Sequence, residues 1–247
     1  MKKFELDTKE NFIIYLRRLI QNTQSEIRTL KRYLKELELL IIDREYDKNP
    51  KKIINPNLYI DINNKIGMVT NQLLNLIGDH TNLAISYKKF RFIAQKRMEK
   101  GLDLYLEPLS DEILDILSQL NEARNWSLHV PESLLTAEME MINILLNDNS
   151  DKLFPAPFNP IYVTQFDNYE AEWLNDLLKQ TKHMNIAFSK VFQQMKMDYS
   201  KLIGEYVRVL NKEGGTRTIH ELNLPLISYD IQRRKYSGIE NYDIQLP

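Results

Sequence analysis

The stretch "ARNWSLH" gathers the side chains of this chain that are best suited to phosphate chemistry: Arg124, Asn125 and His129. A guanidinium can hold a phosphate with two hydrogen bonds and can stabilise negative charge that develops during a reaction. An imidazole titrates near neutral pH, so it can move protons to and from ribose and leaving-group oxygens. The asparagine can orient the imidazole or donate to the phosphate. Because RNA carries its own nucleophile, the 2′-hydroxyl, these groups could cleave a phosphodiester without a metal.

The proline that follows decides how these three side chains can meet. On an unbroken helix Asn125 and His129 share one face, whereas Arg124 points towards the apolar side of its own helix. Pro131 lacks an N–H group, and Val130 before it is biased away from helical dihedral angles. We therefore expect the helix to kink or end near His129 and a new helix to start at the proline. The N–H groups of a helix start attract anions.

A structural role for the same residues is equally open from the sequence alone. An arginine at a helix end often caps carbonyls or pairs with a carboxylate, and Glu122 and Glu132 are both near Arg124 in the sequence. A histidine beside a proline kink can bind a carbonyl that the kink has freed. Composition and spacing therefore leave a catalytic site and a structural helix end as alternatives.

The motif "RNWSLH" resembles the R-N-x-x-x-H signature of the HEPN superfamily. This resemblance implies an all-helical bundle with the motif at a junction between two late helices. Many HEPN proteins are metal-independent ribonucleases of toxin–antitoxin, phage-exclusion and CRISPR systems, and they dimerise so that two motifs form one cleft. The resemblance implies that Arg124 is the phosphate-binding residue, Asn125 the orienting residue and His129 the acid/base residue. Other members lack catalysis and serve as binding or scaffolding modules.

A second candidate surface is the basic stretch "YKKFRFIAQKRMEK", in which aromatic residues interrupt the basic ones. Aromatic and basic side chains in alternation are typical of surfaces that bind single-stranded nucleic acids. A basic run is also what a solvated helix face looks like, so both interpretations remain. The candidate nucleic-acid contacts are Lys88, Lys89, Arg91, Lys96 and Arg97. The tail segment "QRRK" is a comparable candidate.

The remaining histidines do not indicate a metal or cofactor site. His80 falls on the apolar seam of a predicted helix, which favours a hydrogen-bonded core residue. His183 and His220 have no companion ligands in the sequence. No His/Asp/Glu set has metal-ligand spacing, and no glycine-rich phosphate loop, nucleophile elbow or His-Glu-x-x-His pattern is present. We therefore expect no metal and no cofactor.

Composition and charge narrow the class of protein. The 247 residues are 43% hydrophobic and 27% charged, with a formal net charge of −1, so any RNA contact has to use a local basic patch. The absence of cysteine excludes disulfides, thiolate zinc sites and cysteine nucleophiles. The start of the chain lacks a signal-peptide core, and no apolar run approaches the roughly 20 residues that span a bilayer. These features favour a cytoplasmic protein without a membrane partner.

Two long apolar stripes predict the first helices. Residues at alternating intervals of three and four from Ile13 to Ile41 are apolar except for Thr23, which predicts an amphipathic helix with a coiled-coil-like stripe. The same pattern runs from Ile66 to Ala94 and predicts one continuous helix that closes at Gly101. These stripes also offer apolar surface for a dimer.

Capping residues and prolines place the later elements. Ser110 is predicted to cap a third helix that carries Arg124, and a helical pattern resumes after Pro131. Residues 148–166, rich in proline and aromatics, are predicted to form a long packed crossing loop. Asp167 and Glu170 fit a capping box for a final long helix that ends near residues 214–215. The sequence thus predicts an all-α antiparallel bundle of four to five helices in residues 1–212, and an extended tail or hairpin in residues 213–247.

The leading functional hypothesis is a HEPN-type, metal-independent endoribonuclease in a toxin or phage-defence role. Its expected partners are single-stranded RNA and a second copy of the chain, with an antitoxin or sensor protein as a further possibility. The first alternative is a non-catalytic helical module that binds RNA or a protein. The second is a purely structural, coiled-coil-like dimer.

Overall fold

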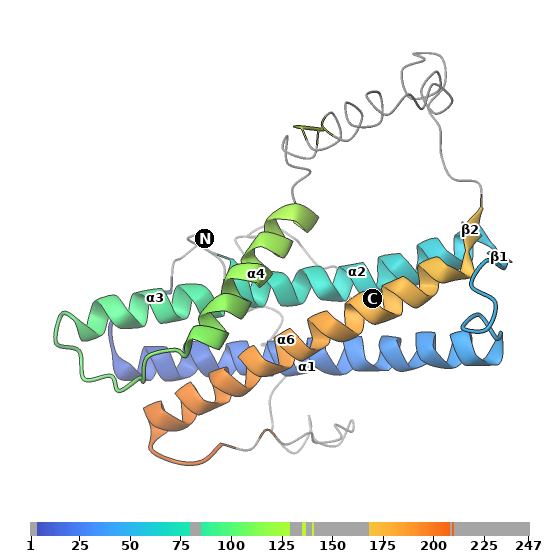
Figure 1. Ribbon diagram of the computed structural model, residues 1–247. Helices are drawn as coiled ribbons and strands as arrows, with labels where there is room; N and C mark the ends of the chain where they lie inside the picture. Colours follow the sequence, from blue (N-terminus) through green and yellow to red (C-terminus); the bar gives the residue numbers. More distant parts are fainter. Residues whose placement is uncertain are drawn as a thin grey trace, which may run out of the picture.

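The computed structural model describes residues 4–79, 85–128, 135, 136, 140, 168–207 and 209. Within these residues the chain forms helices that pack side by side and one two-residue antiparallel strand pair (Figure 1). The all-α bundle predicted from the sequence is therefore confirmed. The elements are α1 (Lys9–Asp43), β1 (Ile53–Ile54), α2 (Pro56–Gly78), α3 (Tyr87–Met98), α4 (Asp111–Leu128), β2 (Tyr169–Glu170) and α6 (Ala171–Ile203).

Helix α1 packs against α2, α3 and α6, and its predicted stripe is confirmed. Thr8 caps its start by accepting a hydrogen bond from the Asn11 amide. From Leu16 to Ile41 every residue of the predicted stripe is buried. Helix α6 lies along α1 in the opposite direction, since Lys182 near its start pairs with Glu38 near the end of α1 at 2.6 Å (Figure 1). Because the stripe is covered within the chain, a dimer would have to use other surfaces.

The continuous helix predicted from Ile66 to Ala94 is wrong, because the chain breaks between α2 and α3. Ser86 caps α3: its hydroxyl accepts from the Lys89 amide at 3.3 Å and donates to the Asp79 carbonyl. The Tyr15 hydroxyl of α1 accepts from the Ser86 amide at 2.9 Å. These bonds replace helical ones at the break. Residues 80–84, which include His80, lie outside the described residues.

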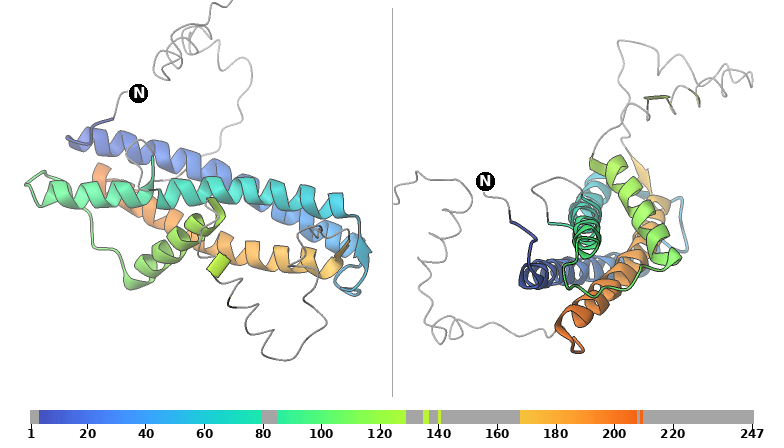
Figure 2. Two further views of the ribbon diagram at one scale, coloured as in Figure 1. Left: turned by 90° about the horizontal axis from the view of Figure 1, so that it is seen from above. Right: turned by 90° about the vertical axis from the view of Figure 1, so that its left-hand side faces the viewer.

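The ends of α3 and α4 agree closely with the sequence. Helix α3 stops at Met98, and Gly101 (φ 86°) lies in the following turn, where its amide donates to the Met98 carbonyl at 2.9 Å. Ser110 caps α4 as predicted, accepting from the Ile113 amide at 3.4 Å. Helix α4 lies against α2 and α6, as the end-on view in Figure 2 shows.

Both predicted ends of the last helix are wrong. Helix α6 starts at Ala171, not after an Asp167 cap, and Glu170 makes no side-chain capping bond. Tyr169 and Glu170 instead pair with Ile54 and Ile53 of β1. The helix ends at Ile203 rather than near residues 214–215, because Gly204 adopts a left-handed conformation (φ 76°) and its amide donates to the Ser200 carbonyl at 2.9 Å.

Several predictions concern segments outside the described residues. These are the helix break at Pro131, the crossing loop of residues 148–166, and the tail of residues 213–247. Asp167, His129 and His220 also lie there. The helix break, the crossing loop, the tail and the roles of the two histidines stay predictions.

Candidate functional site

Arg124 lies near the end of α4, where this helix meets the last turn of α2. Its guanidinium donates from Nε to Asn75 Oδ1 at 3.0 Å, and its Nη2 atom lies 3.2 Å from Asp79 Oδ1. The Nη1 atom lies 3.5 Å from Oδ1 of the exposed Asn125. The side chain is 14% exposed. Asn75 of α2 and Asp79, which directly follows α2, therefore fix one edge of the guanidinium, while another edge faces the surface residue Asn125.

A close approach of two helices makes this contact possible. Gly78 is the last residue of α2, and a Cβ atom at this position would lie only 3.6 Å from the Asn121 Cα of α4. The same Cβ would lie 3.7 Å from Cδ of Arg124. A larger side chain at Gly78 would therefore push α4, and Arg124 with it, away from Asp79.

The electrostatics of the site combine a neutralising carboxylate with a favourable helix end. Asp79 is 12% exposed at its side chain and balances the charge of Arg124. The carbonyl end of α2 also carries partial negative charge, which favours a cation there. Among the described residues, the three contacts of Arg124 use three of the five N–H donors of a guanidinium. Two N–H donors of Arg124 are thus without a partner in the described part of the chain.

The described structure brings together only part of the predicted site. Arg124 and Asn125 are adjacent, whereas His129 lies outside the described residues and its position relative to them stays a prediction. Asn75 and Asp79 were missed by the sequence analysis. Their only sequence signal is a spacing of four on a helix, which places two polar side chains on one face.

Arg91 has a structural role, which removes it from the candidate nucleic-acid contacts. Its Nη2 atom pairs with Asp198 of α6 at 2.6 Å, and the two side chains are only 12% and 3% exposed. Its Nε atom donates to the Tyr87 hydroxyl at 3.2 Å and its Nη1 atom to the Glu107 carbonyl at 2.8 Å. The Tyr87 hydroxyl in turn donates to Asp198 Oδ2 at 2.7 Å. These bonds join α3 to α6.

Burial sets the protonation behaviour of this network. It raises the pKa of the Asp198 carboxyl, although Arg91 and hydrogen bonds from Tyr87 and Gln194 act in the opposite direction. Burial also raises the pKa of the Tyr87 hydroxyl, with a further contribution from Asp198. Arg91 therefore favours the ionised form of the buried Asp198 side chain.

Three of the other predicted basic residues lie around one pocket. Lys89, Lys96 and Arg97, together with Lys100, line a cavity of about 520 Å³ between α3 and residues 4–7. Lys88, the remaining candidate, is half-buried and does not line it. The predicted basic residues are thus divided among the interior (Arg91), the pocket (Lys89, Lys96 and Arg97) and a half-buried position elsewhere (Lys88).

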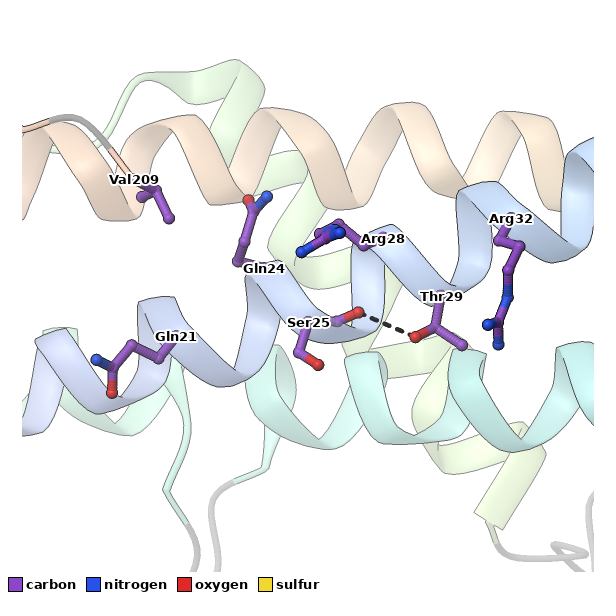
Figure 3. A pocket seen from close by; sticks show the side chains of 7 residues that line it. All are labelled: Gln21, Gln24, Ser25, Arg28, Thr29, Arg32 and Val209. Carbon is purple, nitrogen blue, oxygen red and sulfur yellow. Dashed lines mark hydrogen bonds between the residues drawn. The ribbon is translucent and has the colours of Figure 1, made fainter. Parts of the chain in front are cut away.

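A second cavity, of about 420 Å³, lies on the outer polar face of α1 (Figure 3). Its walls include Gln21, Gln24 and Arg28, with Val209 on the other side. Thr29 lines it as well, and its hydroxyl donates to the Ser25 carbonyl at 3.1 Å. None of the predicted site residues lines this cavity.

The described residues have two further properties. No three histidine, aspartate or glutamate side chains among them gather as metal ligands would. No described helix has both the length and the apolar character that a membrane crossing requires.

Comparison with known proteins adds no assignment to this geometry. The chain matches no protein-family model, no characterised protein and no solved structure.

Proposed function

We propose that this protein is a metal-independent endoribonuclease of the HEPN type, in a toxin or phage-defence role. The observation that carries the proposal is the arrangement of Arg124, which Asn75 and Asp79 hold in place beside the exposed Asn125. A guanidinium that is already oriented loses little conformational freedom when it binds a phosphate, which favours stabilisation of a transition state. The sequence motif supplies the third member, His129.

Each group has a distinct role in the proposed reaction. The 2′-oxygen of the ribose forms a bond to phosphorus while the bond from phosphorus to the 5′-oxygen breaks. His129 takes the proton of the 2′-hydroxyl and delivers a proton to the departing 5′-oxygen. Arg124 and Asn125 bind the phosphate oxygens as negative charge develops. Asp79 acts as a positioning residue. The products carry a 2′,3′-cyclic phosphate and a 5′-hydroxyl, and a second copy of the chain would place two motifs in one cleft.

The second candidate function is a non-catalytic helical module that binds RNA or a protein such as an antitoxin or sensor. The pairing of Arg124 with Asp79 favours it, because the same ion pair would stabilise the contact of α2 with α4 in a protein without catalysis. This candidate predicts no cleavage of any RNA, but a saturable complex that weakens with salt or a stable complex with a partner protein.

The test is cleavage of single-stranded RNA in the presence of EDTA. Wild-type protein should cut, and His129→Ala and Arg124→Ala should each reduce the rate by about 10²–10⁴-fold or more. Arg18→Ala is a matched control, since Arg18 is an exposed arginine of α1. Thermal melts of every variant identify any loss of rate that comes from unfolding. Cleavage that EDTA abolishes, or full activity in both site variants, would refute the mechanism.

A further inference from the structure

The pocket between α3 and the N-terminal residues has walls that are held in place. Arg97 donates from Nε to the Leu6 carbonyl at 3.1 Å and pairs with the Asp7 carboxylate. Leu6 itself is buried in the core. The segment of residues 4–7 is thus fastened to α3. The cavity of about 520 Å³ lies in the range of small-molecule sites, about 300–1,000 Å³.

Exposed aromatic rings line both walls of this pocket. Phe92 of α3 is 53% exposed and Phe4 is 50% exposed. Phe92 lies outside the core face of α3, which consists of Tyr87, Phe90 and Ala94. A half-exposed phenylalanine that contributes little to the core offers a face on which a nucleic-acid base can stack.

Positive charge surrounds the same rings. Four basic and two acidic side chains line the pocket, and one of the acidic ones, Asp7, is paired with Arg97. The Lys96 ammonium lies 4.1 Å from the centroid of the Phe92 ring. Lys100 lies in the turn that follows α3. A cation and an aromatic face side by side match the two parts of a nucleotide, its phosphate and its base.

From these observations we propose that the pocket binds one nucleotide unit of single-stranded RNA. The base stacks on Phe92, and Lys96 and Lys100 bind the neighbouring phosphates. The choice of RNA as the strand rests on the proposed function. Charge favours this occupant over an apolar peptide, because lysines surround the rings and would have to lose water against apolar side chains.

A line of direct contacts connects the pocket to Arg124. Tyr15 lines the pocket, and its hydroxyl binds the Ser86 backbone. The Ser86 hydroxyl donates to the Asp79 carbonyl, and the Asp79 carboxylate pairs with Arg124. These contacts link the pocket to the candidate cleavage site through the break between α2 and α3.

Binding of a labelled single-stranded oligoribonucleotide tests the proposal. The full chain carries His129→Ala, which prevents cleavage during titration. Phe92→Leu keeps an apolar side chain but removes the aromatic face, and it should weaken binding about 5- to 100-fold. Lys96→Gln and Lys100→Gln should each reduce the slope of log affinity against log salt by about 0.7. Tyr105→Ala and Lys31→Gln, at exposed positions that do not line the pocket, are controls that should bind as the parent does.

Two additional measurements separate the possible outcomes. Competition with adenosine monophosphate shows whether a free nucleotide occupies the pocket as well as a strand does. Displacement of the labelled strand by adenosine monophosphate or by unlabelled strand supports the site if it depends on Phe92. Unchanged affinity in Phe92→Leu, or no binding by the parent protein, overturns it. Cleavage by the wild-type chain is measured in parallel. If binding depends on Phe92 but the wild-type chain does not cleave RNA, the ribonuclease is refuted and the pocket is not. If the chain cleaves RNA and Phe92→Leu changes neither cleavage nor affinity, only the pocket is refuted.

Discussion

Replacing Arg91 with methionine should be among the most destabilising single changes that the described structure allows. Methionine has a similar length but cannot donate hydrogen bonds, so Asp198 would lose its charge partner while remaining only 3% exposed. Removing one partner of a buried ion pair costs about 3–5 kcal/mol of unfolding free energy. The lost bond to the Glu107 carbonyl adds little, because that group is at the surface and can bind water.

The cost should depend on pH in a defined direction. Burial already raises the pKa of Asp198 above 3.8 with Arg91 in place, and removal of Arg91 raises it further. A raised folded-state pKa contributes stability that is complete below the unfolded pKa and is lost as pH rises through the folded pKa. Arg91→Met should therefore be closest to wild type in acid and furthest from it near neutral pH. Between the unfolded-state pKa and the folded-state pKa of Asp198, the free energy of unfolding of Arg91→Met should fall by about 1.4 kcal/mol for each pH unit.

Urea unfolding of the two proteins, followed by circular dichroism at several pH values, measures this cost. Asp198→Asn removes the charge that burial disfavours and keeps hydrogen-bonding atoms, so it should cost less than Arg91→Met. Lys182→Met is the control, because it breaks an exposed ion pair and should cost at most about 1 kcal/mol. A cost for Arg91→Met no larger than this control, or one that does not change with pH, would refute the role assigned to Arg91.

Two substitutions at glycines test the fold around the site. Gly204→Ala should destabilise the chain by about 1–2 kcal/mol in a urea titration, since the left-handed backbone at φ 76° disfavours a side chain even where no atom is nearby; an unchanged midpoint would contradict this cap. Gly78→Leu should cost about 1–3 kcal/mol by overpacking the α2–α4 contact, whereas Gly78→Ala should be tolerated because its Cβ makes ordinary contacts at 3.6 Å. Equal melting temperatures for these two variants would show that the helices do not approach so closely.

Local patterns in the sequence were sufficient for elements whose signals are local. The three–four spacing of α1 and the Ser110 cap of α4 each lie within one helix, and both predictions are confirmed. The break between α2 and α3 was missed because the apolar spacing stays in phase across it and neither proline nor glycine interrupts residues 79–86. The bonds that stabilise the break involve Tyr15, which is 71 positions from Ser86.

The errors at α6 and at the site have the same origin. Glu170 fits a capping box locally, yet its segment pairs with β1, a contact that no short window of sequence contains. Arg124 has glutamates nearby in sequence, but its carboxylate partner is Asp79, which directly follows α2. Arg91 fits a basic surface in the sequence, and only the packing of α3 against α6 reveals Asp198 as its partner. Residue types identified candidates, whereas tertiary contacts assigned their roles.

The packing of α1 against α6 has a consequence for synthesis in the cell. The stripe of α1 is covered in part by a helix whose first residue, Ala171, leaves the ribosome about 130 residues after Asp43, roughly 6–26 seconds later at about 5–20 residues per second. During that interval α2 and α3 can shield only part of the stripe. Nascent chains of this protein should therefore recruit chaperones that recognise apolar helices until α6 emerges.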